Sequence, residues 1–425
     1  MKVCRCLLYT LLLTLLSCNS EDSFLPNDVI VNSDNENSNY INHNRWTYEM
    51  MCKHYFWNKD IADSLSLDFS ISPTNFFEKL LSKEDRFSWC EINEDYIGED
   101  LGFQFQTYEI HGSKVNRVLY VSSISLKEQG LKRGDYFLIK GDYIEIGKFN
   151  NKKFTSTKKI KIYNKVTRGR NLAPTVSLDS IYTINDKRIG YFIYDQFESS
   201  TDVAQITIRL KNLDIDELIL DLRYNPGGYV STSKYLASML APKESLGKLY
   251  QLQRYNDYQT KTKIEKGESG VDSVFLDKGF VTLDRNLNLK RLVVLTTKNT
   301  ASASESLIIG LRPYMDVVTV GTKSCGKDVG SYTIADNRYK YQLQPITFRY
   351  YNALNDSTPT TGIRPDIEVA DDLNHERGDI NEALLKTAIN YLIGNNSVGN
   401  NTRSIHTSDN EKECGKSSIE IRNNL

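Results

Sequence analysis

The region that most constrains the fold of this chain is a pair of mainly apolar runs separated by a small-residue segment and a helical pattern. Residues 292–295 and 317–320 have the length and composition of buried strands. Between them, residues 299–305 read Asn-Thr-Ala-Ser-Ala-Ser-Glu, and residues 305–314 carry Leu307, Ile308 and Leu311 at roughly helical spacing. This order predicts a strand, a tight turn, a helix and a second strand, followed by a loop that bears a lysine.

Ser302 and Lys327 are the candidates for chemistry in this region. Ser302 lies at the expected start of the helix, where flanking alanines leave room for a substrate carbonyl and backbone N–H groups can hold an oxyanion. A serine hydroxyl needs a base, and a desolvated lysine can serve where no histidine lies nearby in the sequence. Taken alone, however, the same residues are typical of an ordinary helix cap and a surface lysine.

A second segment ends another predicted strand. Residues 220–228 read Leu-Asp-Leu-Arg-Tyr-Asn-Pro-Gly-Gly and precede a predicted helix at 230–240. A Gly-Gly pair between a strand and a helix permits positive φ and a close approach of the backbone to a ligand. The same pair is also common in a plain strand–helix turn.

Together, residues 220–228, 300–305 and Gly326-Lys327 resemble, in order and spacing, the signatures of the S41 peptidases, the tail-specific or C-terminal processing proteases. The resemblance implies an α/β core of mixed α+β type and of the crotonase/ClpP-like kind, which acts without a cofactor or a metal. It implies Ser302 as nucleophile and Lys327 as base, and an oxyanion hole formed by Ala303 with Gly227 or Gly228. Many family members have a glutamine four residues after the lysine, thought to orient it, whereas this chain has Ser331.

Other catalytic groups stay open as alternatives. A Ser-His-Asp triad would need His375, and tricorn-type relatives recruit a histidine from an N-terminal region, which here leaves His54 or His111. Cys325 lies two residues before Lys327, but no histidine neighbours it in the sequence. The sequence contains no His-Glu-x-x-His motif, so a zinc hydrolase is not expected.

The N-terminus has the features of an export signal. Lys2 and Arg5 precede an apolar run at 7–16, which is too short to span a membrane as a mature helix. Residues 15–18 (Leu-Leu-Ser-Cys) resemble the bacterial lipobox, in which Cys18 would be lipidated. We therefore expect a lipid-anchored protein of the cell envelope outside the cytoplasm, with an ordinary signal peptide as the alternative.

The rest of the chain divides into expected domains. After the signal at 1–18, we expect a flexible tether at 19–40, an N-terminal helical cap at 41–95, a PDZ-like β domain at 96–175, the peptidase core at 176–392 and a disordered tail at 393–425. Two segments carry resemblances: 85–89 (Asp-Arg-Phe-Ser-Trp) resembles the segment before the PDZ domain in this family, and 130–135 (Gly-Leu-Lys-Arg-Gly-Asp) resembles a PDZ turn. PDZ domains hold extended peptide ends by strand addition, and residues 101–104 are the loose candidate for the carboxylate-binding loop. Residues 241–290 predict few strong elements and a peripheral insertion.

The expected function is that of a serine endopeptidase acting on unfolded or extended C-terminal protein segments. The 53 basic and 54 acidic residues give no charge argument for nucleic acid as a partner. Two alternatives remain: a non-catalytic peptide- or ligand-binding lipoprotein on the same scaffold, and a peptide-binding adaptor in which the PDZ-like module carries the function. The sequence does not indicate an oligomeric state.

Overall fold

The computed structural model describes residues 36–92, 101–150, 153–162 and 175–395, with short gaps at 199, 212, 280–284, 337 and 339–340, and a strand at 411–413. The expected signal segment, Cys18, most of the expected tether and nearly all of the expected tail lie outside the described residues. Within the described part of the chain, no helix is both long enough and apolar enough to cross a membrane.

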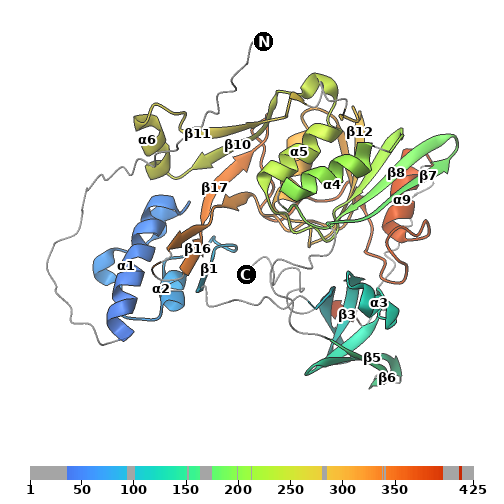
Figure 1. Cartoon of the computed structure of the whole chain (residues 1–425), viewed down its shortest axis with the longest axis horizontal. Helices are drawn as coiled ribbons and strands as arrows, with labels where there is room; N and C mark the ends of the chain where they lie inside the picture. Colours follow the sequence, from blue (N-terminus) through green and yellow to red (C-terminus); the bar gives the residue numbers. More distant parts are fainter. Residues whose placement is uncertain are drawn as a thin grey trace, which may run out of the picture.

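The core is a six-stranded sheet covered by helices on both faces (Figure 1). Five strands are parallel neighbours, and the edge strand β7 runs antiparallel to β8. In sheet order the strands are β18 (Ile367–Glu368), β13 (Asp316–Gly321), β12 (Arg291–Thr296), β9 (Glu217–Asp221), β8 (Lys187–Tyr194) and β7 (Val176–Ile184). This arrangement confirms the predicted mixed α/β fold class.

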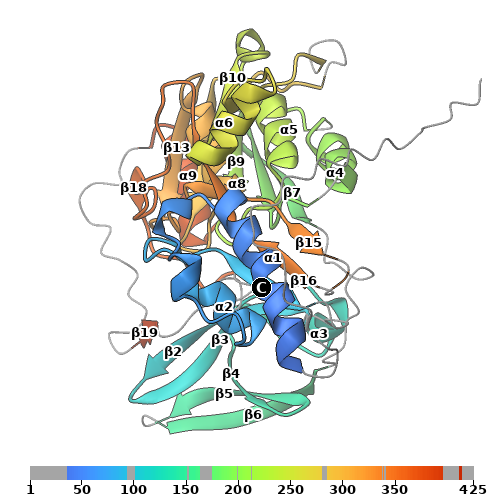
Figure 2. The same cartoon turned by 90° about the vertical axis from the view of Figure 1, so that its left-hand side faces the viewer.

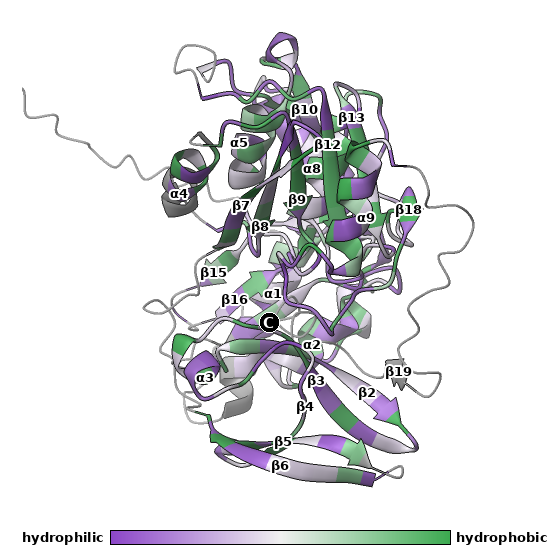
Figure 3. Cartoon of the chain, turned by 90° about the vertical axis from the view of Figure 1, so that its right-hand side faces the viewer, coloured by the Kyte–Doolittle hydropathy of each residue, from purple (hydrophilic) through white to green (hydrophobic). Residues whose placement is uncertain are grey.

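Four helices bury the two faces of this sheet, whose inner strands are strongly apolar (Figure 3). One face packs against a cluster that includes Ile206, Leu236 and Leu307, and the other against a cluster that includes Leu384 and Leu385. The helices are α4 (Ser200–Lys211), α5 (Val230–Leu240) and α8 (Ala303–Leu311) on the first face and α9 (Ala383–Leu392) on the second. The helix predicted at 230–240 matches α5, and β12 and β13 follow the two apolar runs because buried parallel strands read as continuous apolar sequence.

A separate antiparallel sheet forms the β domain, whose own apolar core includes Phe103, Val118 and Phe137. The sheet order is β19-β2-β3-β4-β5-β6. Its elements are β2 (Phe103–Ile110), β3 (Ser113–Val121), α3 (Ile124–Glu128), β4 (Tyr136–Lys140), β5 (Tyr143–Asn150), β6 (Lys153–Lys161) and the distant β19 (Glu411–Glu413). The Gly130–Asp135 turn therefore joins α3 to β4, and β19 lies beside β2 (Figure 2).

The N-terminal unit packs two helices against a small three-stranded sheet. Its elements are α1 (Glu36–His54), the short 3-10 helices Asn58–Asp60 and Ser64–Ser66, α2 (Pro73–Lys79), β1 (Trp89–Ile92), β15 (Ile334–Asp336) and β16 (Tyr341–Gln344). The alternating pattern of residues 341–350 predicts one strand, but the structure divides them into β16 and β17 (Ile346–Tyr351). Pro345 explains the break, because proline has no N–H for a continuous ladder. At this break the chain passes from the sheet that contains β1 and β16 into the sheet that contains β17.

The prediction of few strong elements in residues 241–290 was wrong. After the 3-10 helix Lys243–Ser245, this region forms β10 (Leu249–Tyr255), α6 (Asp257–Glu265) and β11 (Val271–Phe275). The two strands join β17 and β14 (Val329–Ser331) in a sheet of order β11-β10-β17-β14. Asn256 Nδ2 donates to the carbonyl of Tyr55 (2.7 Å), so the tip of this arm contacts the N-terminal unit (Figure 1). The apolar pattern of this region is weak in the sequence because β11 and α6 bury little apolar surface.

Candidate active site

Ser302 lies at the junction between β12 and α8, where the backbone is strained. Thr300 Oγ1 donates to the carbonyl of Leu222 (2.8 Å), which ties the turn to the end of β9. Ser302 has φ 55° and ψ −114°, a combination that costs a non-glycine residue about 1–3 kcal/mol and is typical of functional sites. Ala301 and Ala303 are buried whereas Ser302 is only half-buried. The turn therefore presents the serine toward the surface.

The glycine pair after β9 lies directly against this turn. A Cβ on Gly227, which has φ 104°, would lie 2.7 Å from Ser302 Cβ and 2.8 Å from the Ala303 nitrogen. The Gly227 N–H donates to Asn225 Oδ1 (2.9 Å). Among the described residues, the Gly228 N–H has no hydrogen-bond partner. The structure thus brings Gly227 against Ser302 and Ala303, while Gly228 packs against the backbone of Phe197. Of the two glycine amides, that of Gly228 is the one left for a ligand.

Glu305 connects the serine turn to the lysine loop. Its buried carboxylate accepts hydrogen bonds from the Ser302 N–H (3.0 Å) and the Lys327 N–H (2.9 Å) on one oxygen. The other oxygen accepts from Ser324 Oγ (2.5 Å) and the Gly326 N–H (2.7 Å). Burial raises the pKa of Glu305, and these four donors oppose that effect. Glu305 was not among the predicted site residues, although a Ser followed three residues later by Glu at a helix start is a capping-box signal.

Lys327 follows in the loop between β13 and β14 and is half-buried. Burial lowers the pKa of Lys327, against the opposing attraction of Cys325, Glu305 and Asp85. The main chain of Lys327 is also fixed, because Tyr350 OH donates to its carbonyl at 2.8 Å. A lysine in these surroundings releases its proton more easily than one in water, which is what a general base requires.

Neither Ser331 nor a histidine takes the place of the family's glutamine. Ser331 Oγ accepts a hydrogen bond from Gln344 Nε2 (3.1 Å) within the neighbouring strands. His375 Nδ1 pairs with Asp372 Oδ2 (2.7 Å), His54 Nδ1 with Gln259 Nε2 (2.6 Å), and His111 lies at the β2–β3 hairpin. Within the described residues, no group of three or more possible metal ligands occurs. The structure thus gives His375 and His54 side-chain partners of their own and places His111 in the β domain.

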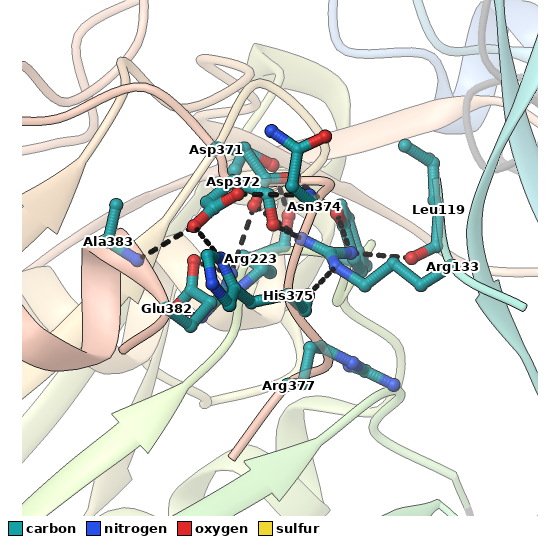
Figure 4. Close-up of polar contacts among 12 residues, drawn as sticks. Leu119, Arg133, Arg223, Asp371, Asp372, Asn374, His375, Arg377, Glu382 and Ala383 are labelled. Atoms are coloured by element: carbon teal, nitrogen blue, oxygen red, sulfur yellow. Dashed lines mark hydrogen bonds and ion pairs between the residues drawn. The ribbon is translucent and has the colours of Figure 1, made fainter. Parts of the chain in front are cut away.

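A buried charge network supports the strand end that leads to the glycine pair. Arg223 is fully buried and forms ion pairs with Asp221 (3.0 Å), Glu382 (2.9 Å) and Asp371 (2.9 Å). Figure 4 shows Arg223 beside Glu382 and Asp371. Because each buried charge has a partner and hydrogen bonds, the network avoids the large cost of an isolated ion. It links β9, the loop before α9 and α9 itself, directly upstream of Asn225.

The β domain enters the same network through its Gly130–Asp135 turn. Arg133 Nη1 donates to Tyr224 OH (2.5 Å). Arg133 Nη2 donates to Asp371 Oδ1 (2.7 Å) (Figure 4). Gly134 packs so closely against the core that a Cβ would lie 2.1 Å from the Leu373 carbonyl oxygen. The turn that resembles a PDZ motif is therefore also the contact between the β domain and the core.

Comparison with known proteins agrees with this arrangement. A model described as peptidase family S41 matches residues 188–369, and the peptidase S41 N-terminal domain matches residues 42–89. The two matches together cover more than half of the chain. The chain belongs to peptidase family S41. The family match spans Ser302, Lys327 and the glycine pair, and the N-terminal match ends at the 85–89 segment.

Curated relatives in the family carry the name carboxyl-terminal-processing protease. The chain is 30% identical to the one from Synechocystis sp. over 141 residues, which are 33% of this chain and 28% of that protein. It is 27% identical to the one from Picosynechococcus sp. over 169 residues, 38% of this chain and 34% of that protein. The matched stretches thus make up about a third of these relatives' length.

Solved structures agree with the fold. A crystal structure of a putative S41 protease from Bacteroides fragilis has a TM-score of 0.68 at 24% identity and covers 82% of this chain and 97% of its own. The photosystem II D1 C-terminal processing protease has a TM-score of 0.50 at 16% identity and covers 77% of this chain and 92% of its own. These likenesses concern the fold of the chain.

Proposed function

We propose that this chain is a serine endopeptidase that cleaves unfolded or C-terminal protein segments with a Ser302–Lys327 pair. The observation that carries the proposal is the shared carboxylate of Glu305, which binds the backbone N–H groups of both Ser302 and Lys327. Strain at Ser302, a lowered pKa at Lys327 and family membership support the same proposal. The activity requires no cofactor.

The proposed mechanism has two half-reactions. Ser302 Oγ bonds to the scissile carbonyl carbon while its proton moves to the neutral amine of Lys327. The Gly228 and Ala303 amides hold the tetrahedral oxyanion, a stabilisation of about 3 kcal/mol per donor. When the C–N bond breaks, Lys327 returns the proton to the leaving amine. A water molecule then attacks the acyl-enzyme by the same route and restores Ser302.

The test is cleavage of casein or another denatured protein by the full chain. We expect Ser302→Ala and Lys327→Ala to reduce cleavage at least 1,000-fold while folding is retained. Lys323→Ala is the matched control, because Lys323 is an exposed lysine of the same loop. Equal cleavage in all three variants would place the chemistry elsewhere. An inert wild type would favour the non-catalytic binding alternative.

A second candidate function is peptide binding by the β domain. One observation favours it: β19 pairs antiparallel with the edge strand β2, with Glu411 opposite Ile110 and Glu413 opposite Tyr108. This edge therefore accepts an extended strand, which is how PDZ-like modules take peptides. The direction of β19 carries the chain toward the Phe103 end of β2, where the candidate carboxylate-binding loop at 101–104 begins.

This second function is tested by fluorescence anisotropy with labelled peptides of varied C-termini. If the β domain takes peptides at β2, a proline in place of Thr107 should weaken binding, because it removes an N–H from the edge ladder. Thr155→Pro on the opposite edge strand β6 is the control. If the adaptor role is the main one, Ser302→Ala should leave the biological function unchanged.

We also propose that a lipid on Cys18 tethers the protein to the cell envelope outside the cytoplasm. The support is the sequence alone: a short apolar run that ends in Leu-Leu-Ser-Cys. Metabolic labelling with a fatty-acid analogue should mark the wild type but not Cys18→Ser. Labelling that persists in Cys18→Ser would rule out this anchor.

A further inference from the structure

The segment that precedes β1 is built as a rigid turn. Asp85 Oδ1 accepts hydrogen bonds from the N–H groups of Phe87 (2.8 Å) and Ser88 (2.9 Å). Asp85 Oδ2 accepts from the hydroxyl of Tyr55 (2.8 Å), a fully buried residue at the end of α1. The N-terminal unit thus fixes the backbone on which Phe87 is carried.

The same turn is attached to the lysine loop on the core. Arg86 Nη2 donates to the carbonyls of Gly326 (2.6 Å) and Thr360 (3.0 Å). On the other side, Ser88 Oγ accepts from the N–H of Ile346 (2.8 Å). These contacts join residues that are distant in the sequence, and Gly326 directly precedes Lys327. The position of the turn relative to Lys327 is therefore set by several independent hydrogen bonds.

The ring of Phe87 faces the amine of Lys327. Lys327 Nζ lies 5.1 Å from the centroid of the Phe87 ring, within the distance at which an aromatic face attracts a cation. Unlike the amide group of a glutamine, a phenyl ring has no N–H that could donate to the lone pair of a neutral amine. The lone pair of a neutral Lys327 is therefore left for the Ser302 hydroxyl.

We propose that Phe87 is the positioning residue for Lys327: its ring holds the amine in place and excludes water, in the role that other family members give to a glutamine. The inference rests on the proposed Ser302–Lys327 pair and names the group that sets its geometry. The N-terminal unit is then part of the active site, since without its turn the amine would be open to solvent. The titratable and charged groups around Lys327 are Cys325 on its own loop, Glu305 on α8, and Asp85 and Arg86 on the turn.

The experiment compares Phe87→Ala, which opens the space, with Phe87→Leu, which fills it without an aromatic face. Phe275→Ala on the exposed end of β11 is the matched control. The first readout is competitive labelling of the full chain with acetic anhydride across a pH series, with Lys327 measured against Lys323 by peptide mass spectrometry. The second readout is kcat and KM for a denatured protein substrate over the same pH series.

In the wild type, labelling of Lys327 should begin at a lower pH than labelling of the exposed Lys323. Phe87→Ala should move the Lys327 profile toward that of Lys323 and lower kcat roughly 10- to 100-fold with little change in KM, because the amine is solvated and misplaced. In Phe87→Leu, labelling of Lys327 should still begin at the low pH of the wild type, since leucine also excludes water. The variant should nevertheless lose part of kcat. A merely structural role would not move the labelling profile.

The inference is overturned if Phe87→Ala and Phe275→Ala give the same labelling profile as the wild type. If Phe87→Ala fails to fold, Phe87→Leu and Arg86→Met decide: Arg86→Met releases the turn from Gly326 and should also raise the labelling pH of Lys327. A shifted profile with no cleavage by the wild type would support the positioning role and reject the peptidase proposal. Cleavage by the wild type, together with an unchanged labelling profile in Phe87→Ala, would support the peptidase proposal and reject the positioning role.

Discussion

Ser302 and Lys327 are joined through a single oxygen, because Glu305 Oε2 accepts the backbone N–H of both residues. The two candidate catalytic residues come from different loops, so this carboxylate fixes the distance between their backbones. It also compensates for the strained φ of Ser302 by holding the N–H of that residue.

The first prediction concerns this carboxylate. Glu305→Gln should lower kcat about 100-fold and destabilise the fold by about 2 kcal/mol, because an amide NH2 would replace an acceptor that serves two N–H donors. Steady-state kinetics and urea unfolding measure the two effects. Glu265→Gln, an exposed carboxylate on α6, should change neither. Full activity in Glu305→Gln would show that the bridge is not needed.

The second prediction follows from the lowered pKa of Lys327. Only the neutral amine can accept a proton, so kcat/KM should rise with pH and level off at a pH below the ordinary lysine value of about 10.4. The lowered pKa also costs stability, because below that ordinary value the unfolded chain binds a proton that the buried amine binds less tightly. The contribution of this group to stability therefore rises with pH, as the activity does. Lys327→Met should therefore be inactive but more stable at neutral pH, by about 1.4 kcal/mol for each unit of pKa lowering. A loss of stability in Lys327→Met would contradict this account.

The order of strands, helices and loops around the candidate site could be predicted from the sequence for a physical reason. Buried parallel strands and the helix at 230–240 leave strong local patterns, and the loops that follow them carry Ser302, Lys327 and the glycine pair. The structure also narrows the oxyanion candidates, because the Asn225 side chain already engages the Gly227 N–H.

What the sequence did not indicate depends on contacts between distant segments. Nothing local in residues 85–89 shows that Phe87 faces Lys327, since the contact forms only when the N-terminal unit packs on the core. The arm at 249–275 was missed because its strands are held by β17 rather than by their own apolar pattern. Arg133 likewise reaches Tyr224 and Asp371 only across the domain contact.

The third prediction tests the close approach at the glycine pair. Gly227→Ala should abolish activity and destabilise the fold by about 2–4 kcal/mol, since its Cβ would overlap Ser302 and the Ala303 nitrogen. Gly112→Ala is the matched control: it has a similar positive φ of 77°, but a Cβ there would meet nothing within 4 Å. The control should cost only about 1 kcal/mol and keep full activity. Thermal unfolding and peptide cleavage separate the two outcomes.

The fourth prediction concerns the contact between the β domain and the core. Burial alone would raise the pKa of Asp371, but Arg133 and Arg223 lower it to about 2. A carboxyl whose pKa falls on folding stabilises the protein above its unfolded value of about 3.9 and loses that effect as the pH drops through the folded value. The fold should therefore lose about 2 kcal/mol of stability between pH about 4 and 2 from this group.

The matched variant for that loss is Asp371→Asn, which removes the titrating charge but leaves two buried guanidinium groups with less compensation. It should be less stable than the wild type at neutral pH by about 3–5 kcal/mol. Its free energy of unfolding should also fall less than that of the wild type between pH about 4 and 2. Asp316→Asn, an exposed aspartate at the start of β13, should behave like the wild type. If the wild type and Asp371→Asn lose the same unfolding free energy at acid pH, the network does not depend on this carboxylate.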